Sequence, residues 1–311
     1  MEMVFILIEV LLKILLLLMS VAFLSLFERK LLGYSQSRKG PNVVWKFGIF
    51  QPFADAMKLI SKVDSSPGKA SMIGFFVSPV FFFFVMLGSW SAIPVEFNSS
   101  SFQFSGMFII FWLSLGTYSL IFSGWFSFSK FSTLGICRAI AQSISYEIVF
   151  TFSVFSIFLV SGSVNLLEIN YLFESNSPSL VMGFLCVIFF ISILAESNRT
   201  PFDLPEGESE LVGGYSVEYG SISYTILFLG ENISLIFSSF FFSVVFFSSF
   251  LFLLKFSFFL FLFIWIRSTL PRIRFDKMMN LCPLVLFTNK WKNENMVSSC
   301  AWKTHVLLDM N

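Results

Sequence analysis

Long apolar stretches constrain the fold of this chain more than any other feature of its sequence. Residues 3–27, 71–94 and 221–245, for example, each offer the roughly 20 apolar residues that a helix needs to cross a bilayer. The 311 residues are 56% hydrophobic, 46 of them are phenylalanine, and only 13% are charged, whereas soluble domains have about 25% charged residues. A soluble fold could not hide so much apolar surface. We therefore expect an all-α fold, a polytopic transmembrane helical bundle.

The charges between the apolar stretches predict the orientation of the bundle. Seven spans are predicted, near residues 3–27, 71–94, 105–127, 138–161, 179–195, 221–245 and 249–267. Four connecting segments together carry 15 lysines and arginines, and these are 28–70, 128–138, 196–220 and 267–280. The other three segments carry none, and these are 95–104, 162–178 and 246–248. Because positively charged loops stay on the inner side of a membrane, the N-terminus is predicted outside and the charged segments inside.

The sequence divides into a membrane domain, residues 1–280, and a C-terminal tail, residues 281–311. An eighth transmembrane helix would have to come from the tail, where the apolar stretch 281–287 has only seven residues. That length is far short of a bilayer span. The tail is therefore treated as a divergent segment, and no eighth span is assigned.

An amphipathic helix is predicted inside the first long inner loop. From Phe53 to Val63 the apolar residues recur at helical spacing, and Asp55, Lys58 and Lys62 occupy the other face. A helix of this kind lies on a membrane surface with its apolar side in the interface. Membrane anchoring alone would explain the pattern equally well.

Two carboxylates lie deep within predicted spans. Glu147 is about 13 Å along a helix from Arg138, and Glu231 is about 16 Å from Gly220, at 1.5 Å per residue. Both therefore lie near the middle of the bilayer, where a charged carboxylate costs on the order of several kcal/mol. Because the charged form is costly there, it lies closer in free energy to the protonated form than it would in water. Such a group can gain and lose a proton at working pH, which favours a proton or ion path. The alternative is a neutral glutamic acid that is hydrogen-bonded for packing.

The inner loop 196–220 is rich in carboxylates and has a single basic residue, Arg199. Its acidic residues begin with Glu196, Asp203, Glu206, Glu208 and Glu210. Crowded carboxylates near a region of low dielectric constant raise one another's pKa and titrate as a group. The loop is therefore interpreted as an antechamber that loads protons, with a solvated acidic loop as the alternative. No metal site is expected, because the spacing matches no specific metal motif.

The sequence contains no set of ligands for a redox cofactor. None of the four cysteines forms a CxxC pair, and His305 is the only histidine, so no zinc or iron–sulfur site can be assigned. If the protein takes part in redox chemistry, a partner must carry the electrons. The net charge of +1 gives no general attraction to nucleic acid, and no nucleic-acid partner is expected.

Five ordered segments carry a resemblance to a known family. They are ERKLLGYSQSRKGPN at 28–42, QPFADAMKLISK at 51–62, RAIAQSISYE at 138–147, AESNRTPFDLPEGESELVGG at 195–214 and RSTLPRIRFD at 267–276. Together they resemble the mitochondrially encoded chain 1 subunits of respiratory complex I, the NADH–ubiquinone oxidoreductase. The chain departs from that family at Trp45, where glycine is usual, at Val63, where glutamate is typical, and after Met279, where the family continues into an eighth helix.

The resemblance implies a multi-pass subunit of the mitochondrial inner membrane that binds no cofactor covalently. Ubiquinone would be the substrate, and FMN and the iron–sulfur clusters would belong to partner subunits. The partners implied are the hydrophilic subunits of the quinone cavity on the matrix side, neighbouring small membrane subunits and the lipid bilayer. The family's quinone-tunnel and interface positions are matched by Glu28, Arg29, Gln36, Arg38, Asp55, Arg199, Phe202, Asp203, Phe228 and Arg267. Its acidic proton-coupling channel is matched by Glu147, Glu196, Glu206, Glu208, Glu210 and Glu231.

Other classes of membrane protein also have carboxylates within the bilayer. A stand-alone ion or proton transporter would more often contain inverted repeats and broken helices, and no repeat is found in this sequence. The homologous subunit of a membrane-bound hydrogenase would have nickel-containing partners. A protein of the secretory pathway would carry a glycan on the sequon at Asn98.

Overall fold

The computed structural model describes residues 2–64, 66–91, 103–166, 168–169, 183–205, 207, 211–247 and 252–281, with side chains from residue 11 onward. Every regular element among these residues is helical, which confirms the predicted all-α class. The helices are α1 (Glu2–Ser35), α2 (Gln51–Ser61), α3 (Met72–Ser91), α4 (Ser105–Phe126), α5 (Lys130–Ser161), α8 (Gly183–Glu196), α10 (Ser221–Phe246) and α11 (Phe252–Thr269). Two short 3-10 helices, η1 (Lys46–Gly48) and η2 (Gly214–Ser216), lie in the loops.

Six of the described helices are long and apolar enough to cross a membrane. They are α1 from Leu11 onward, α3, α4, α5, α10 and α11. Helix α8 has 14 described residues, and the part of its predicted span before Gly183 lies outside the described residues. The polytopic helical bundle is therefore confirmed, whereas the seventh span and the orientation of the bundle remain predictions. The tail beyond residue 281 also lies outside the described residues.

Three helices extend beyond the predicted spans. Helix α1 continues through Glu28 to Ser35, and α5 begins at Lys130, eight residues before Arg138. Helix α11 runs to Thr269, so that Arg267 lies in its last turn. The physical reason is that glutamate, lysine and arginine are good helix formers, so a helix need not end where the apolar stretch ends. These extensions place Glu28 and Arg267 on helices instead of in loops.

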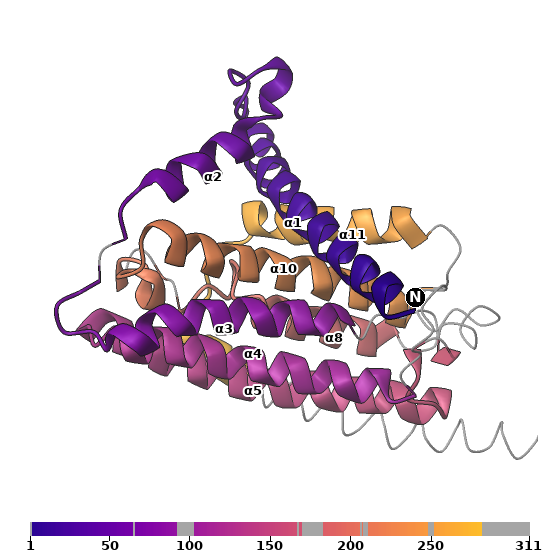
Figure 1. Ribbon diagram of the computed structural model, residues 1–311. Coiled ribbons are helices and arrows are strands. Elements are labelled where there is room, and N and C mark those ends of the chain that lie inside the picture. The colour runs from indigo at the N-terminus through magenta and orange to yellow at the C-terminus, as the bar shows by residue number, and fades with distance from the viewer. Residues whose placement is uncertain are drawn as a thin grey trace, which may run out of the picture.

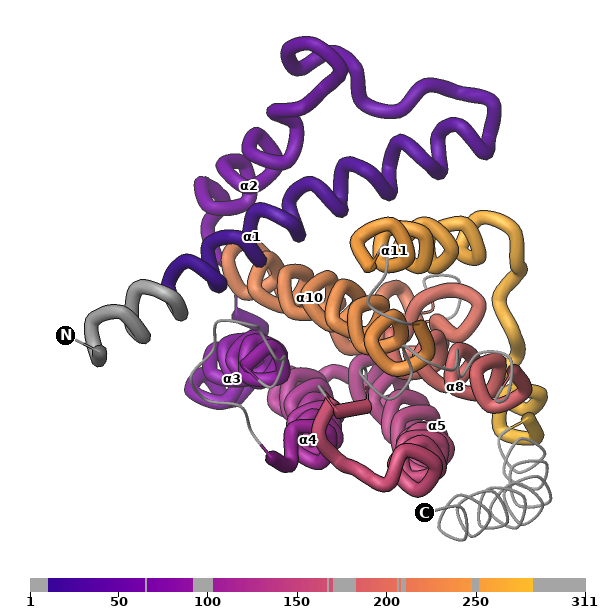
Figure 2. The backbone as a smooth tube through the Cα atoms, turned by 90° about the vertical axis from the view of Figure 1, so that its right-hand side faces the viewer, coloured from indigo at the N-terminus to yellow at the C-terminus, as the bar shows by residue number. Residues whose placement is uncertain are grey.

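The helices form layers that Figure 2 shows nearly end-on. Helices α3, α4 and α5 lie side by side in one row, and α10 and α8 form a second row against them. Glycines allow close approach within the first row: a Cβ on Gly88 would lie 2.7 Å from the Trp112 ring, and one on Gly124 would lie 2.4 Å from Ile136. Such contacts are typical of helices that pack within a membrane.

Helix α1 leans across the bundle instead of running parallel to it. Figure 1 shows α1 and α2 meeting at the η1 loop and diverging toward the bundle, with α10 beneath them. Helix α1 contacts α2, α10 and α11. The rings of Phe23 and Phe53 meet edge-on between α1 and α2, with their centroids 6.4 Å apart. The two helices therefore touch through this aromatic contact and diverge from the η1 loop toward the bundle (Figure 1).

The predicted amphipathic helix is present as α2. Pro52 occupies its first turn, a position that tolerates a residue without an N–H. The apolar residues Phe53, Met57 and Ile60 are exposed on the chain. On the polar side, Asp55 pairs with Arg29 of α1 at 2.5 Å. The helix is confirmed, and its place on a membrane surface remains a prediction.

The loop before α2 adopts backbone conformations that favour glycine. Trp45, which stands where glycine is usual in the resembling family, has a φ of 57°, a conformation that is rare for a bulky side chain. The Trp45 ring lies against Phe50, with a centroid separation of 4.9 Å. Gly48 has a φ of 68°, and a Cβ there would lie 2.3 Å from the Pro41 carbonyl oxygen. Trp45 is accommodated in this conformation because its ring packs on Phe50, the residue that precedes α2.

Two apolar cores lie on either side of α10. The first joins α5, α8 and α10 through stacked phenylalanine rings, such as Phe150 and Phe189 at 5.1 Å. The second joins α1, α3 and α10 and includes Val21, Phe82 and Leu227. Helix α10 contributes residues to both cores.

The inner loop after α8 rests on α5 through a contact between glycines. A Cβ on Gly135 would lie 3.0 Å from the Cα of Gly214 and 3.1 Å from the Pro205 carbonyl oxygen. Both neighbours are backbone atoms, which cannot move away without shifting the loop. Gly135 therefore sets how closely the loop approaches the bundle.

We predict that Gly135→Ala destabilises the protein by about 1–3 kcal/mol, the usual cost of overpacking. The matched control is Gly183→Ala, because a Cβ at Gly183 meets open space and alanine favours a helix. The measurement is the thermal unfolding midpoint of the detergent-solubilised assembly that contains the chain. Equal midpoints for the two variants would contradict the proposed contact.

Candidate functional site

A cluster of charged and polar side chains joins four parts of the fold. Glu28 of α1, only 8% exposed, accepts hydrogen bonds from Arg199 Nη1 at 3.3 Å and from Arg267 Nη1. Arg199 also donates from Nη2 to Asn232 Oδ1 at 3.1 Å. We call Glu28, Arg199, Arg267 and Asn232 the Glu28 cluster. It connects α1, the loop after α8, α10 and α11.

Local helix geometry explains why these residues meet. Val21, Leu24 and Glu28 are three and four residues apart, so they share one face of α1, and all three are buried. On α10, Asn232 donates from Nδ2 to the Phe228 carbonyl oxygen at 2.7 Å. This bond orients the amide so that its oxygen, an acceptor, faces the Arg199 guanidinium. The apolar neighbours therefore direct the polar groups toward one another.

A second group of charges is more exposed and ties α1 to α2. Asp55 accepts a hydrogen bond from Gln51 Nε2 at 2.9 Å in addition to its pair with Arg29. In the loop after α1, Arg38 Nε donates to Gln36 Oε1 at 2.8 Å. Exposed ion pairs contribute only about 0–1 kcal/mol, so these residues orient the loop more than they stabilise it.

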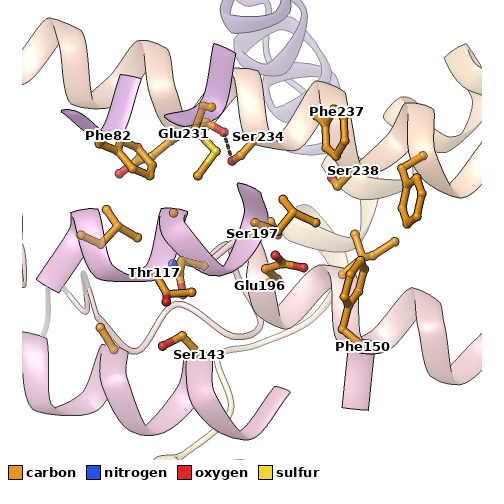
Figure 3. A pocket seen from close by; sticks show the side chains of 18 of the residues that line it. Phe82, Thr117, Ser143, Phe150, Glu196, Ser197, Glu231, Ser234, Phe237 and Ser238 are labelled. Carbon is orange, nitrogen blue, oxygen red and sulfur yellow. Dashed lines mark hydrogen bonds between the residues drawn. The ribbon is translucent and has the colours of Figure 1, made fainter. Parts of the chain in front are cut away.

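An acidic cavity of about 50 Å³ lies inside the bundle, between α3, α4, α5, α8 and α10. Two carboxylates, Glu196 and Glu231, line it together with hydroxyl side chains and an apolar wall that includes Phe82 and Phe237. Figure 3 shows Glu231 and Ser234 on one side of the cavity, Ser143 on the opposite side, and Glu196 between them. The cavity has room for a few water molecules.

The hydroxyl groups around the acidic cavity are oriented by their own helices. Ser234 donates to the Glu231 carbonyl oxygen at 2.7 Å, Thr117 to the Ser114 carbonyl oxygen at 2.8 Å, and Ser143 to the Ile140 carbonyl oxygen at 3.3 Å. A hydroxyl that donates to its own helix keeps its lone pairs as acceptors. Water in the cavity could therefore donate to the hydroxyls and the carboxylates alike. This arrangement can support a hydrogen-bonded chain along which protons move.

The Glu28 cluster and the acidic cavity are joined at two places in the chain. Glu196 lines the cavity, and Arg199, three residues later, binds Glu28. On α10, Glu231 lines the cavity, and its neighbour Asn232 binds Arg199. A displacement of Arg199 would therefore act on the elements that hold both carboxylates.

The remaining predicted site residues have different positions. Phe202 is buried, and the centroid of its ring lies 5.8 Å from that of Tyr146. Asp203 is half-buried in the same loop. Glu147 of α5 does not line the cavity, but it lies close enough to Glu196 for their charges to interact. Phe228 precedes Asn232 by one turn of α10. Three predicted acidic-channel residues lie outside the described residues, and these are Glu206, Glu208 and Glu210.

Two residues that anchor the inner loop were not predicted. Gln142 of α5 donates from Nε2 to the Ala195 carbonyl oxygen at 2.7 Å and to the Phe202 carbonyl oxygen at 2.8 Å. Asn232 holds Arg199, as described above. For both residues the sequence offers one signal, a polar side chain within an apolar helix. The signal does not identify their partners, because these lie more than 30 residues away along the chain.

Tyr219 anchors the far end of the same loop. Its ring stacks on Phe75 with a centroid separation of 4.2 Å, and its hydroxyl donates to the Ser123 carbonyl oxygen at 2.7 Å. Burial raises the pKa of Tyr219 to about 12, although the hydrogen bond with Ser78 lowers it. The phenol therefore remains a neutral donor at working pH.

The described residues do not assemble a metal-binding group. Among the parts of the chain that the structure describes, no three His, Cys, Asp or Glu side chains come together in a way that could hold an ion. Cys137 and Cys186 are free thiols.

Comparison with known proteins places these features in a family. Residues 8–293 match the family model described as NADH dehydrogenase. The NADH-ubiquinone oxidoreductase chain 1 of Patiria pectinifera is 42% identical over 280 residues, 85% of each chain. That of Aedes aegypti is 42% identical over 276 residues, covering 87% of this chain and 88% of the relative. That of Anopheles gambiae is 44% identical over 276 residues, with the same coverage of 87% and 88%.

The fold and the site define a polytopic helical membrane protein in which a buried charge cluster adjoins an acidic cavity. The family match spans most of the chain. The chain therefore belongs to the NADH dehydrogenase family, as its five quoted segments predicted.

We predict that Arg199→Lys weakens the Glu28 cluster, because an ammonium group cannot bind Glu28 and Asn232 with the two arms of a planar fork. The expected cost is about 1–3 kcal/mol, that of a poorly satisfied buried polar group. Thermal inactivation of the solubilised assembly should become faster. The matched control is Arg274→Lys, since Arg274 and its partner Asp276 are mostly exposed. If both variants inactivate at the same rate, the cluster does not stabilise the fold.

Proposed function

We propose that this chain is a core membrane subunit of a proton-pumping NADH:ubiquinone oxidoreductase, respiratory complex I. In this role it forms part of the quinone-binding tunnel and an acidic proton-coupling channel. Family membership and 42–44% identity to the chain 1 relatives support the assignment to the complex. The finer assignment of tunnel and channel rests on the arrangement of the side chains.

The observation that carries the proposal is the position of Arg199. It binds Glu28 at the inner end of α1 and Asn232 at the edge of the acidic cavity. Reduction of a quinone to a neutral quinol takes up equal numbers of electrons and protons. The side chains that give up those protons become more negative, so the charge near the site changes. A change near Glu28 would alter the balance of charges on Arg199 and so act on the segments that hold Glu196 and Glu231.

The exposed phenylalanines of α1 and α2 support the quinone part of the proposal. A quinone has a polar headgroup with carbonyl acceptors and an apolar tail. Exposed Phe23, Phe27 and Phe53 offer an apolar lining, and Arg29, which pairs with Asp55, offers donors beside it. Ubiquinone is the substrate of this reaction, and in the proposal the electrons come from FMN and iron–sulfur clusters in partner subunits.

The acidic cavity supports the proton-coupling part. Glu196 and Glu231 share a space with room for water, and Glu147 interacts with Glu196 from α5. The loop residues Glu206, Glu208 and Glu210 would load protons from the inner side, as the sequence predicts. Together these residues would relay a charge change at the quinone toward the pumping subunits.

The proposal includes a location and a set of partners. The chain lies in the mitochondrial inner membrane as a multi-pass protein, in contact with lipid. Hydrophilic subunits of the quinone cavity would bind its inner loops on the matrix side, and small membrane subunits would pack beside its helices. A native gel of mildly solubilised mitochondrial membranes tests this: peptides from 28–70 and 196–220 are expected in a large band with NADH dehydrogenase activity. Detection only in a small inactive band would instead favour a stand-alone transporter.

We predict that Glu147→Gln or Asp203→Asn lowers the NADH:ubiquinone reductase rate of the assembled complex by about 100-fold or more. The first variant removes a proposed proton-coupling group, and the second removes a charge at a proposed quinone-tunnel position. NADH oxidation with artificial acceptors should be unchanged, because it bypasses the quinone. The control is Glu168→Gln, an exposed carboxylate on the predicted outer side. Undiminished quinone reduction in an assembled Glu147→Gln or Asp203→Asn variant would refute the assignment of that residue.

A further inference from the structure

Tyr215 connects the inner loop to the carboxylate of the acidic cavity. It belongs to η2 and is only 2% exposed. Its phenol hydroxyl donates a hydrogen bond to Glu231 Oε1 in the middle of α10. Tyr215 does not line the cavity, whereas Glu231 does. The Glu231 carboxylate is therefore held from outside the cavity by a residue that the sequence analysis did not select.

The backbone around Tyr215 is shaped to bring the phenol to this point. Gly213 and Gly214 have φ values of 121° and 58°, which favour glycine over other residues. The contact between Gly135 and Gly214 presses η2 against α5. On the other side of Tyr215, Tyr219 fixes the loop to α3 and α4. Tyr215 thus lies between two anchors and has little freedom to move away from α10.

A phenol is suited to hold a carboxylate that changes its protonation state. Its hydroxyl donates to the carboxylate anion and favours that form. When Glu231 carries a proton, the same oxygen can accept a hydrogen bond from it. The phenol therefore keeps a partner in both states, which an apolar side chain in its place would not.

Among the residues that the structure describes, few other charges face Glu231. Glu196 of α8 shares the cavity with it, and Glu147 of α5 acts through Glu196. The Glu28 cluster reaches the neighbouring residue Asn232 through Arg199. The residues that α3 and α4 contribute to the cavity wall are uncharged, and they include Phe82, Met86 and Thr117.

We propose that Tyr215 is a positioning residue for proton transfer at Glu231, and that it makes the protonation of this carboxylate depend on the inner loop 211–220. The loop holds the phenol, the phenol holds the carboxylate, and the carboxylate faces the cavity. A displacement of the loop would withdraw the donor and strengthen the hold of Glu231 on its proton. This inference rests on the proton-carrying role proposed above for Glu231.

The test uses assembled complex I that carries Tyr215→Phe, and its matched control is Tyr219→Phe. Both variants remove the hydroxyl of a buried tyrosine in the same loop, but the Tyr219 hydroxyl donates to a backbone carbonyl. The readout is the pH dependence of the carboxyl C=O band in infrared difference spectra recorded on quinone reduction. The band of Glu231 is identified by its loss in Glu231→Gln. The pumped protons per electron are measured in proteoliposomes as a second readout.

In Tyr215→Phe the pH dependence of the Glu231 band should differ from that of the unaltered complex, because a donor to the anion has been removed. The number of protons pumped per electron should fall. Tyr219→Phe keeps the ring that stacks on Phe75 and so keeps the loop in place, and this variant should titrate as the unaltered complex does. If Tyr215→Phe also titrates as the unaltered complex, or if both variants shift equally, the proposal for Tyr215 is overturned.

Two further variants separate the other possible outcomes. Full quinone reduction and pumping in Glu231→Gln would overturn the proposed function of Glu231 itself, whatever Tyr215→Phe does. If Tyr215→Phe fails to assemble, Glu231→Asp tests the same hydrogen bond from the other side. This variant keeps a carboxyl group but withdraws it from the phenol by one methylene, so the number of protons pumped per electron should also fall. Undiminished pumping in Glu231→Asp would overturn the role of Tyr215.

Discussion

The hydrogen bonds of Arg199 to Glu28 and Asn232 are the interactions on which the arrangement of the site depends. Glu28 and the Arg199 side chain are mostly buried, and an unpaired charge in such a place is strongly destabilising. The pairing therefore restricts where α1, the loop after α8 and α10 can lie relative to one another. Because Asn232 follows Glu231 directly in α10, the same restriction sets the position of the acidic cavity.

The apolar environment explains the rest of the architecture. Backbone groups inside a bilayer must be satisfied within the protein, so the chain uses long helices and keeps irregular segments at their ends. Glycines such as Gly88, Gly124 and Gly135 let the helices and the inner loop approach closely. Serine hydroxyls satisfy themselves on their own helices and leave acceptors for the cavity. The acidic cavity therefore lies within a bundle whose two cores are formed largely by phenylalanine.

Several features were predictable because they depend on local sequence. The apolar stretches indicated the helices, the charges within them drew attention to Glu147 and Glu231, and the quoted segments indicated the family. The continuation of α1 and α5 past the apolar stretches was missed, since hydropathy does not report where a helix ends. Tyr215 was also missed, because nothing in its neighbourhood distinguishes a tyrosine that holds a carboxylate from one that packs.

The sequence by itself determined that this chain is an all-α membrane protein with carboxylates in and beside its spans. Hydropathy and charge are sums over neighbouring residues, so they can be evaluated without a fold. Tertiary structure alone decided that Glu196 and Glu231 share a cavity while Glu147 lies beside it, and that Arg199 meets a residue 171 positions away. Such pairings follow from the rotation of each helix about its axis and from the close approach of helices and loops, which depend on how all the side chains pack together.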